Sequence, residues 1–222
     1  MYYFCDVLKD KAMNAIVIQP TRQPARQMPT NRTTTFLEWN TARFLVSALE
    51  NEGERNTALM VATQMYFGLR IGDVLSLTWG DIRQTVMTIG EGKTGKARTI
   101  TLHPDYVAIR DRYLSTFYAN RQPADHEPVF VGTRGPRTGQ AITVTAANNR
   151  FASALKRHDI ETANASTHTL RKTFGRRVWE STGKSEAGLV LLSQILNHSS
   201  TAVTRLYLGI TGEEIAAAYL SL

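Results

Sequence analysis

The sequence lacks the features that mark several large classes of protein. Its 222 residues include a single cysteine, Cys5, which excludes an internal disulfide and a multi-cysteine zinc site. No apolar run approaches the ~20 residues of a membrane span, and the opening residues lack the basic start and apolar core of a signal peptide. There is no Gly-x-x-x-x-Gly-Lys-Ser/Thr loop and no acidic cluster arranged for two metal ions. We therefore expect a soluble, cytoplasmic protein without membrane contact.

Acidic residues are fewer than basic ones. Lysine and arginine number 26 against 19 aspartate and glutamate, which gives a formal charge of +7 and a pI near 9.7. This balance favours a polyanionic partner. With 42% hydrophobic and 20% charged residues, the composition is that of a globular protein rather than a disordered or fibrous one. The length allows one or two domains.

The first 34 residues differ in composition from the rest. The segment 19–32 holds three prolines and three arginines, Arg22, Arg26 and Arg32, and no acidic residue. This composition predicts an extended basic arm over residues 1–34. The folded part is expected to begin at Thr35, because Thr35-Phe36-Leu37-Glu38 has the spacing of a capping box ahead of a helix that ends near residue 49.

Most of the chain after the arm has helical periodicity. Two segments, 85–89 and 98–102, are instead alternating and β-branched, and they flank a glycine-rich stretch that predicts a β-hairpin. The predicted fold is mainly α with one small antiparallel β-sheet, an α+β class. Further helices are expected over residues 55–67, 71–77 (with Trp79-Gly80-Asp81 as its exit), 105–118, 145–158, 168–181, 189–196, 201–208 and 212–220.

Two arginines each have a polar residue three positions away on the same side of a predicted helix. His168 and Arg171 form one pair, and an arginine on an inward face must be satisfied by an anion. Arg70 and Asp73 form the other pair. Taken singly, the first pair is more often a core histidine next to an arginine that binds a protein carboxylate. The second is more often a helical ion pair. A carboxylate can also hold a guanidinium whose remaining donors face a phosphate.

The predicted hairpin tip is basic. Lys93, Lys96 and Arg98 lie within six residues and are flanked by glycines that permit close approach of another backbone. Lysines at a hairpin edge often serve only to prevent strand pairing. The alternative is an arm that reaches a nucleic-acid groove and delivers an ammonium to a reacting oxygen.

His198 and Tyr207 lie nine residues apart near the end of the sequence. On one continuous helix they would face opposite sides. Asn197 and Ser199-Ser200 favour a turn, so a second short helix is expected to carry Tyr207 back toward the histidine. Taken alone, such a tyrosine is more often half-buried core than a nucleophile.

Taken in order, these residues resemble the tyrosine recombinases, the phage-integrase family. Four linked motifs carry the resemblance over about residues 35–210, and they include both arginine boxes of the family. Two departures are Asn197, where a glycine is common, and Lys172, where a histidine is common. The matching segments are Gly68–Ile82, Lys93-Thr94-Gly95, His168–Phe174 and Leu196–Tyr207.

The resemblance implies the DNA breaking-rejoining fold of the family's catalytic domain and a site-specific recombinase that acts through a covalent 3′-phosphotyrosyl link. In this interpretation Tyr207 is the nucleophile, and Arg70 and Arg171 hold the non-bridging oxygens of the phosphate. His168 transfers protons, and His198 donates to the phosphate. The link conserves phosphodiester energy, so neither ATP, a metal ion nor another cofactor is expected.

The resemblance also assigns supporting residues. Lys93 is the expected general acid, with Lys96 as the alternative in the same loop, and Asp73 would orient the cations of the site. DNA contacts are expected from Lys96, Arg98, Lys172 and the three arginines of the arm.

The implied partner is double-stranded DNA with a specific recombination site. The resemblance implies that four copies of the chain assemble on this DNA, that the free protein is a monomer or dimer, and that accessory DNA-bending proteins take part. The expected location is the cytoplasm, at the nucleoid during reaction. The helix at 212–220 could pack on its own domain or dock on a neighbouring subunit.

Two alternative functions are a type IB topoisomerase that relaxes DNA and a non-catalytic DNA-binding regulator that retains the fold. Integration, excision and inversion of an element would use the same active site.

The domain arrangement follows from these boundaries. With the catalytic domain predicted over residues 35–222, about 34 residues precede it, too few for a full core-binding domain. The chain thus resembles the compact, single-domain Fim-type invertases, and we expect its basic arm to replace part of the missing DNA clamp.

Overall fold

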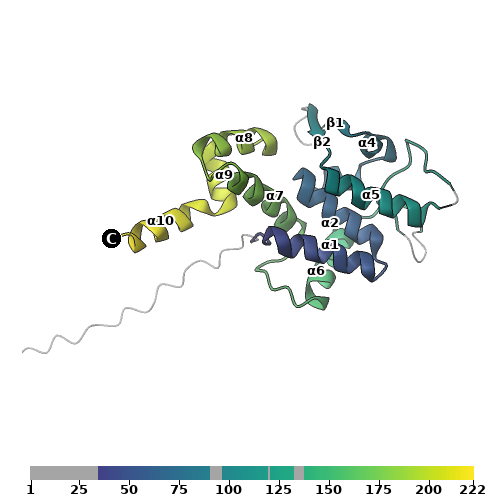
Figure 1. The fold of residues 1–222 in the computed structure, drawn as a ribbon, viewed down its shortest axis with the longest axis horizontal. Helices are drawn as coiled ribbons and strands as arrows, with labels where there is room; N and C mark the ends of the chain where they lie inside the picture. The colour runs from purple at the N-terminus through teal and green to yellow at the C-terminus, as the bar shows by residue number, and fades with distance from the viewer. Residues whose placement is uncertain (1–34, 91–96, 120, 133–137) are drawn as a thin grey trace, which may run out of the picture. The chain divides into compact units, whose positions relative to one another are not determined.

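The computed structural model describes residues 35–90, 97–119, 121–132 and 138–222 (Figure 1). Within these ranges the chain forms ten helices and one two-stranded antiparallel sheet, which confirms the predicted mainly α architecture. The expected arm, with Arg22, Arg26 and Arg32, lies outside the described residues. The expected hairpin tip with Lys93 and Lys96 lies outside them as well.

Most of the predicted helices and strands agree with the structure to within a few residues. Strands β1 (Val86–Gly90) and β2 (Ala97–Thr101) pair antiparallel, with Val86 opposite Thr101. The helices are α1 (Trp39–Asn51), α2 (Arg55–Phe67), α3 (Ile71–Leu75), α4 (Trp79–Arg83), α5 (Pro104–Phe117), α6 (Val144–Arg157), α7 (Thr167–Ser181), α8 (Glu186–Leu196), α9 (Thr201–Leu208) and α10 (Ile210–Leu220).

The predicted capping box at Thr35 is wrong. α1 begins only at Trp39, with Glu38 at its N-cap. The Thr35 hydroxyl forms a hydrogen bond with the hydroxyl of Thr162 instead, and the Thr35 N–H donates to the carbonyl of Ala163. The hydroxyl and the N–H of Thr35 therefore bind tertiary partners on the segment before α7 instead of capping a helix.

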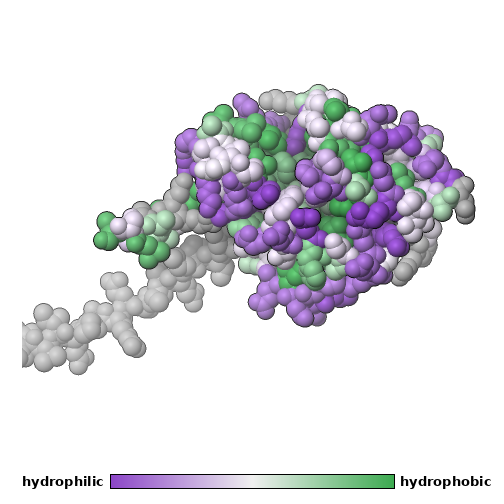
Figure 2. Space-filling view, in the orientation of Figure 1, coloured by the Kyte–Doolittle hydropathy of each residue, from purple (hydrophilic) through white to green (hydrophobic). Residues whose placement is uncertain are grey.

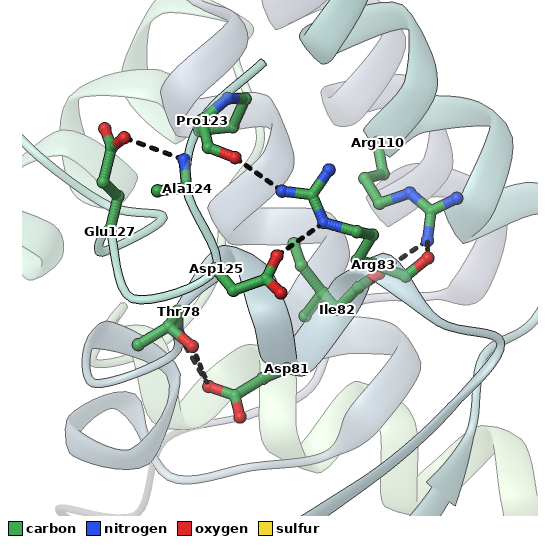
Figure 3. Close-up of polar contacts among 9 residues, drawn as sticks. All are labelled: Thr78, Asp81, Ile82, Arg83, Arg110, Pro123, Ala124, Asp125 and Glu127. Atoms are coloured by element: carbon green, nitrogen blue, oxygen red, sulfur yellow. Dashed lines mark hydrogen bonds and ion pairs between the residues drawn. The ribbon is translucent and has the colours of Figure 1, made fainter.

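The predicted exit at Trp79-Gly80-Asp81 is also wrong, because these residues begin α4. Asp81 accepts hydrogen bonds from both the backbone N–H (2.7 Å) and the hydroxyl of Thr78 (Figure 3). A threonine followed by an acid three residues later forms a capping box here, although the glycine between them is more typical of a turn.

Helix α2 lies at the centre of the fold. Nearly every residue of α2 is buried, and the helix packs against α1, α5 and α7. It ends at Gly68, whose φ of 61° is the left-handed conformation that glycine adopts readily. A Cβ atom at Gly68 would lie 2.2 Å from the ring of Phe174, so the absence of a side chain also lets α7 approach the end of α2.

Two arginines fix the short helix α4 to its surroundings (Figure 3). Arg110 of α5 donates to the carbonyls of Ile82 (2.5 Å) and Arg83 (3.0 Å), which have no partner within the helix because they lie at the end of α4. Arg83 in turn donates to the Asp125 carboxylate (2.8 Å) and the Pro123 carbonyl (2.5 Å). Because β1 follows directly, these bonds also hold the base of the hairpin.

The buried residues form two hydrophobic clusters that share α7. The larger one includes α1 to α6 and reaches Leu170 at the start of α7. The smaller one contains Trp179 near the end of α7, together with Leu192, Leu196 and Leu208 of α8 and α9. In Figure 1, α8 and α9 lie beside α7, whose other end meets α1 and α2. The ends of α2 and α8 thus meet along α7.

The last helix carries exposed apolar side chains. Ile215, Tyr219 and Leu220 of α10 are 55%, 75% and 89% exposed. On the face shown in Figure 2, the body has mixed hydrophilic and hydrophobic side chains, whereas the end of α10 is mainly hydrophobic. No helix in the described ranges is both long and apolar enough to cross a bilayer.

Candidate active site

Arg171 of α7 connects the end of α2 to the end of α8, where the candidate site lies. Its side chain is buried, with the residue only 3% exposed. Its Nη1 donates to the carbonyl of Gly68 at the end of α2 (2.6 Å), and its Nη2 donates to the carbonyl of Leu196 at the end of α8 (2.8 Å). The last carbonyls of a helix have no partner within it and carry partial negative charge, so one guanidinium satisfies both ends.

Arg70 enters the same region from the junction of α2 and α3. It follows the left-handed Gly68 by two residues and stands, with extended backbone, at the N-cap of α3. Its positive charge lowers the pKa values of His168, His198 and Tyr207. The first arginine box and the three downstream residues are therefore gathered in space, as the sequence predicted.

His168 stands in the first turn of α7 and is exposed. Partial burial of its ring lowers its pKa, and the nearby charges of Arg171, Lys172 and Arg70 lower it further. The imidazole is therefore neutral at pH 7 and can accept a proton.

His198 follows α8 at a sharp turn. Asn197 closes the helix with a φ of 54°, a left-handed conformation that asparagine tolerates better than most residues with a side chain. The His198 Nδ1 lies 3.0 Å from the hydroxyl oxygen of Thr204. Burial lowers the pKa of His198 to about 4, with Arg171 and Arg70 as further causes.

Tyr207 returns toward His198 on a separate helix, as predicted. The Ser200 side chain accepts a hydrogen bond from the Val203 N–H and so caps α9. The rings of Tyr207 and His198 lie 5.1 Å apart between centroids, with their planes at 73°. Burial raises the pKa of Tyr207 to about 12, although the nearby positive charges of two arginines act in the opposite direction.

This arrangement suits an anion held beside a phenol. Arg70 and Arg171 supply positive charge, and guanidinium donors match the oxygens of a phosphate. His168 and His198 are neutral near pH 7, so each can donate or accept a proton. A buried phenol such as that of Tyr207 must lose its proton to act as a nucleophile, which the surrounding positive charge favours.

Two contacts of the site were not predicted from the sequence. Thr204 is fully buried and contacts His198. The available signal was its position three residues before Tyr207, on the same side of α9. Lys172, expected at the DNA surface, is only 7% exposed, and its Nζ lies 5.2 Å from the centre of the Tyr207 ring.

Other expected site residues are less directly placed. Asp73 has its Oδ2 atom buried without a hydrogen-bond partner among the described residues, so its orienting role stays a prediction. Arg98 of β2 donates from Nη2 to the carbonyl of Phe67 at the end of α2 (2.6 Å). The choice between Lys93 and Lys96 as general acid also stays open, because both lie outside the described residues.

Comparison with known proteins points to one family. The model of the phage integrase family matches residues 35–214. A protein named tyrosine recombinase XerC, from Bradyrhizobium diazoefficiens, is 30% identical over 194 residues, covering 81% of this chain and 56% of its own length. A protein named probable integrase/recombinase YoeC, from Bacillus subtilis, is 29% identical over 152 residues, covering 68% of this chain and 76% of its own.

Solved structures share the fold. The crystal structure of XerA recombinase superposes with a TM-score of 0.65 at 21% identity, covering 85% of this chain and 65% of that one. A post-cleavage complex of XerH site-specific recombinase gives 0.62 at 17% identity, covering 83% and 52%. These matches confirm the predicted tyrosine recombinase fold. The chain spans about half the length of the XerC relatives that it matches, from 43% to 57%.

Proposed function

The chain belongs to the phage integrase family, and from this premise we propose that it cleaves and rejoins double-stranded DNA at a specific site through a 3′-phosphotyrosyl intermediate. The observation that carries the proposal is the position of Tyr207 beside the two arginines that would hold a phosphate. Arg70 and Arg171 both lie close enough to lower the pKa of the Tyr207 phenol. A phosphodiester bound by these guanidiniums would therefore lie beside the phenolic oxygen.

The reaction balances without a cofactor. The Tyr207 hydroxyl loses its proton to His168, and its oxygen forms a bond to the phosphorus while the bond to the 5′-oxygen breaks. Lys93 gives a proton to the departing 5′-oxygen, with Lys96 as the alternative donor. The reverse steps, with a 5′-hydroxyl as the attacking group, rejoin the strand and release Tyr207.

His198 would stabilise the pentacoordinate transition state as a neutral donor. With a pKa near 4 it is uncharged at pH 7, so it can donate to the phosphate only through a ring N–H. Its Nδ1 faces the Thr204 hydroxyl, which leaves Nε2 for the phosphate. In the structure the Thr204 hydroxyl donates to the Ser200 carbonyl at 3.3 Å. In this role it turns its proton to Nδ1 instead, and the proton of the ring resides on Nε2.

DNA and other copies of this chain are the proposed partners. The net charge of +7 suits a phosphate backbone, and the arm and hairpin tip concentrate basic residues. The exposed apolar residues of α10, Ile215, Tyr219 and Leu220, support docking on a neighbouring protomer in a tetramer on DNA. We place this activity at the nucleoid.

A trapping experiment tests the proposal. The full chain is incubated with a pool of randomised duplexes, each carrying a nick, and protein–DNA adducts that survive SDS are isolated and sequenced. Wild-type protein should give adducts that share a sequence, and Tyr207→Phe should give none. Tyr118→Phe is the matched control, because this tyrosine stands at the end of α5, where it packs against the larger hydrophobic cluster, and its replacement should leave the adducts unchanged.

The same experiment separates the alternatives. Adducts without a shared sequence, together with relaxation of supercoiled plasmid by a monomer, would indicate a topoisomerase. DNA binding without any adduct would indicate a regulator that retains the fold. Persistence of adducts in Tyr207→Phe would show that another residue is the nucleophile.

A further inference from the structure

Lys172 is a largely buried cation that lies over the ring of Tyr207, the proposed nucleophile. It follows Arg171 on α7 and is 7% exposed, and its Nζ lies over the Tyr207 ring, 5.2 Å from the centroid. None of the ion pairs within the described ranges includes Lys172. A cation on a largely buried side chain is costly without a counter-charge. An anion that forms during the reaction would therefore stabilise Lys172.

The charged and titratable groups around Tyr207 are otherwise positive or neutral. Arg171 on α7 and Arg70 at the start of α3 are cations, and His168 on α7 and His198 before α9 are neutral at pH 7. None of these four groups is an anion, so the anions that Lys172 would meet during the reaction are the bound phosphate and, once ionised, the phenolate of Tyr207. Lys172 is the cation that lies over the ring of this phenol.

The contact is electrostatic. A cation over a neutral aromatic ring is attracted by the ring quadrupole. When the phenol ionises, the side chain gains a full negative charge, most of it on the oxygen, and the attraction to the ammonium rises because two opposite charges now face each other. Since the ammonium lies over the ring and no hydrogen bond joins it to the hydroxyl, it acts through its charge rather than by proton transfer.

We propose that Lys172 stabilises the phenolate of Tyr207, both when it attacks DNA and when it departs during rejoining. This inference rests on the proposed function of Tyr207 as the nucleophile and replaces the DNA contact expected from the sequence. Burial lowers the pKa of Lys172, as expected for an ammonium without a counter-anion, and the phenolate would supply that anion.

A titration without DNA tests the contact directly. Tyr207 is replaced in the full chain by 3,5-difluorotyrosine, whose phenol ionises near neutral pH, and its pKa is followed by fluorine NMR. In Lys172→Met this pKa should rise by about 1, and Lys172→Arg should restore it. Lys184→Met is the matched control, because Lys184 also lies over an aromatic ring, that of Trp179 at 5.7 Å, away from the site.

Cleavage provides the second readout. With a nicked duplex recovered by trapping, Lys172→Met should form the adduct about tenfold more slowly at unchanged DNA affinity, the rate equivalent of a change of about 1 in the pKa of the phenol. If Lys172→Met does not fold, Lys172→Gln replaces it.

An unchanged phenol pKa overturns the inference, and a loss of DNA affinity instead would assign Lys172 to DNA binding. Failure of the proposed function would appear as an absence of adduct in the wild type, while the titration still reports on the contact.

Discussion

Replacement of Arg171 by lysine should weaken both the fold and the reaction. The arginine donates to the carbonyls of Gly68 and Leu196 at 2.6 and 2.8 Å from a buried position. A lysine keeps the positive charge, but its single ammonium cannot span both carbonyls, so one charge-assisted hydrogen bond is lost.

The magnitude follows from that one bond. A hydrogen bond from a charged donor contributes about 1.5–3 kcal/mol, so the free energy of unfolding should fall by about 2 kcal/mol. For a domain of this size the melting temperature should drop by about 4–8 °C. Cleavage should slow by about 10²-fold or more, because a preorganised donor to the phosphate is lost as well.

Three measurements on the same variant check this reasoning. Urea unfolding followed by tryptophan fluorescence gives the stability, single-turnover adduct formation gives the cleavage rate, and titration with labelled duplex gives the DNA affinity. DNA affinity should change little, since the chain has many other basic residues. A variant that unfolds at the wild-type urea concentration would refute the claim that Arg171 ties α2 to α8.

Three further predictions concern stability. Gly68→Ala should destabilise the protein by about 2 kcal/mol or more, because it adds a Cβ against Phe174 to a left-handed residue. Gly53 is also left-handed but has no atom near the position of a Cβ, so Gly53→Ala should lose only ~1 kcal/mol. Urea unfolding compares the free energies of unfolding of the two variants. Arg110→Met should lower the melting temperature by about 4–8 °C in calorimetry, since two carbonyls at the end of α4 lose their donor. The pKa of His198, about 4, lies below the ~6.5 of an unfolded histidine, so the unfolded chain binds the extra proton between these values. Stability should therefore fall as pH drops from about 6.5 toward 4, and urea midpoints of His198→Gln should depend less on pH.

Local sequence predicted helices well where one pattern governs the segment. α2 was predicted over the residues that it occupies, because a continuous apolar run ends at a glycine. Thr35 shows the limit of this approach. Its sequence fits a capping box, but its hydroxyl pairs with Thr162, which is distant in sequence. A local pattern cannot reveal a competing tertiary partner.

The candidate site was predicted as a set of residues but not as a network. The order of Arg70, His168, Arg171, His198 and Tyr207 pointed to one constellation, and the break at Asn197 explained how the last two residues meet. Nothing in the sequence indicated that Arg171 would bind the ends of two helices.

The sequence by itself determined the types of residue available for chemistry, the order of the helices and the position of the turn before α9, because these depend on composition and on neighbours within a few residues. Only the tertiary structure decided what each cation faces. Arg171 contacts helix-end carbonyls, and Lys172, from which the sequence predicted a DNA contact, lies over the Tyr207 ring. The physical reason is that burial and charge pairing are set by segments far apart in the chain, where α2, α7, α8 and α9 meet.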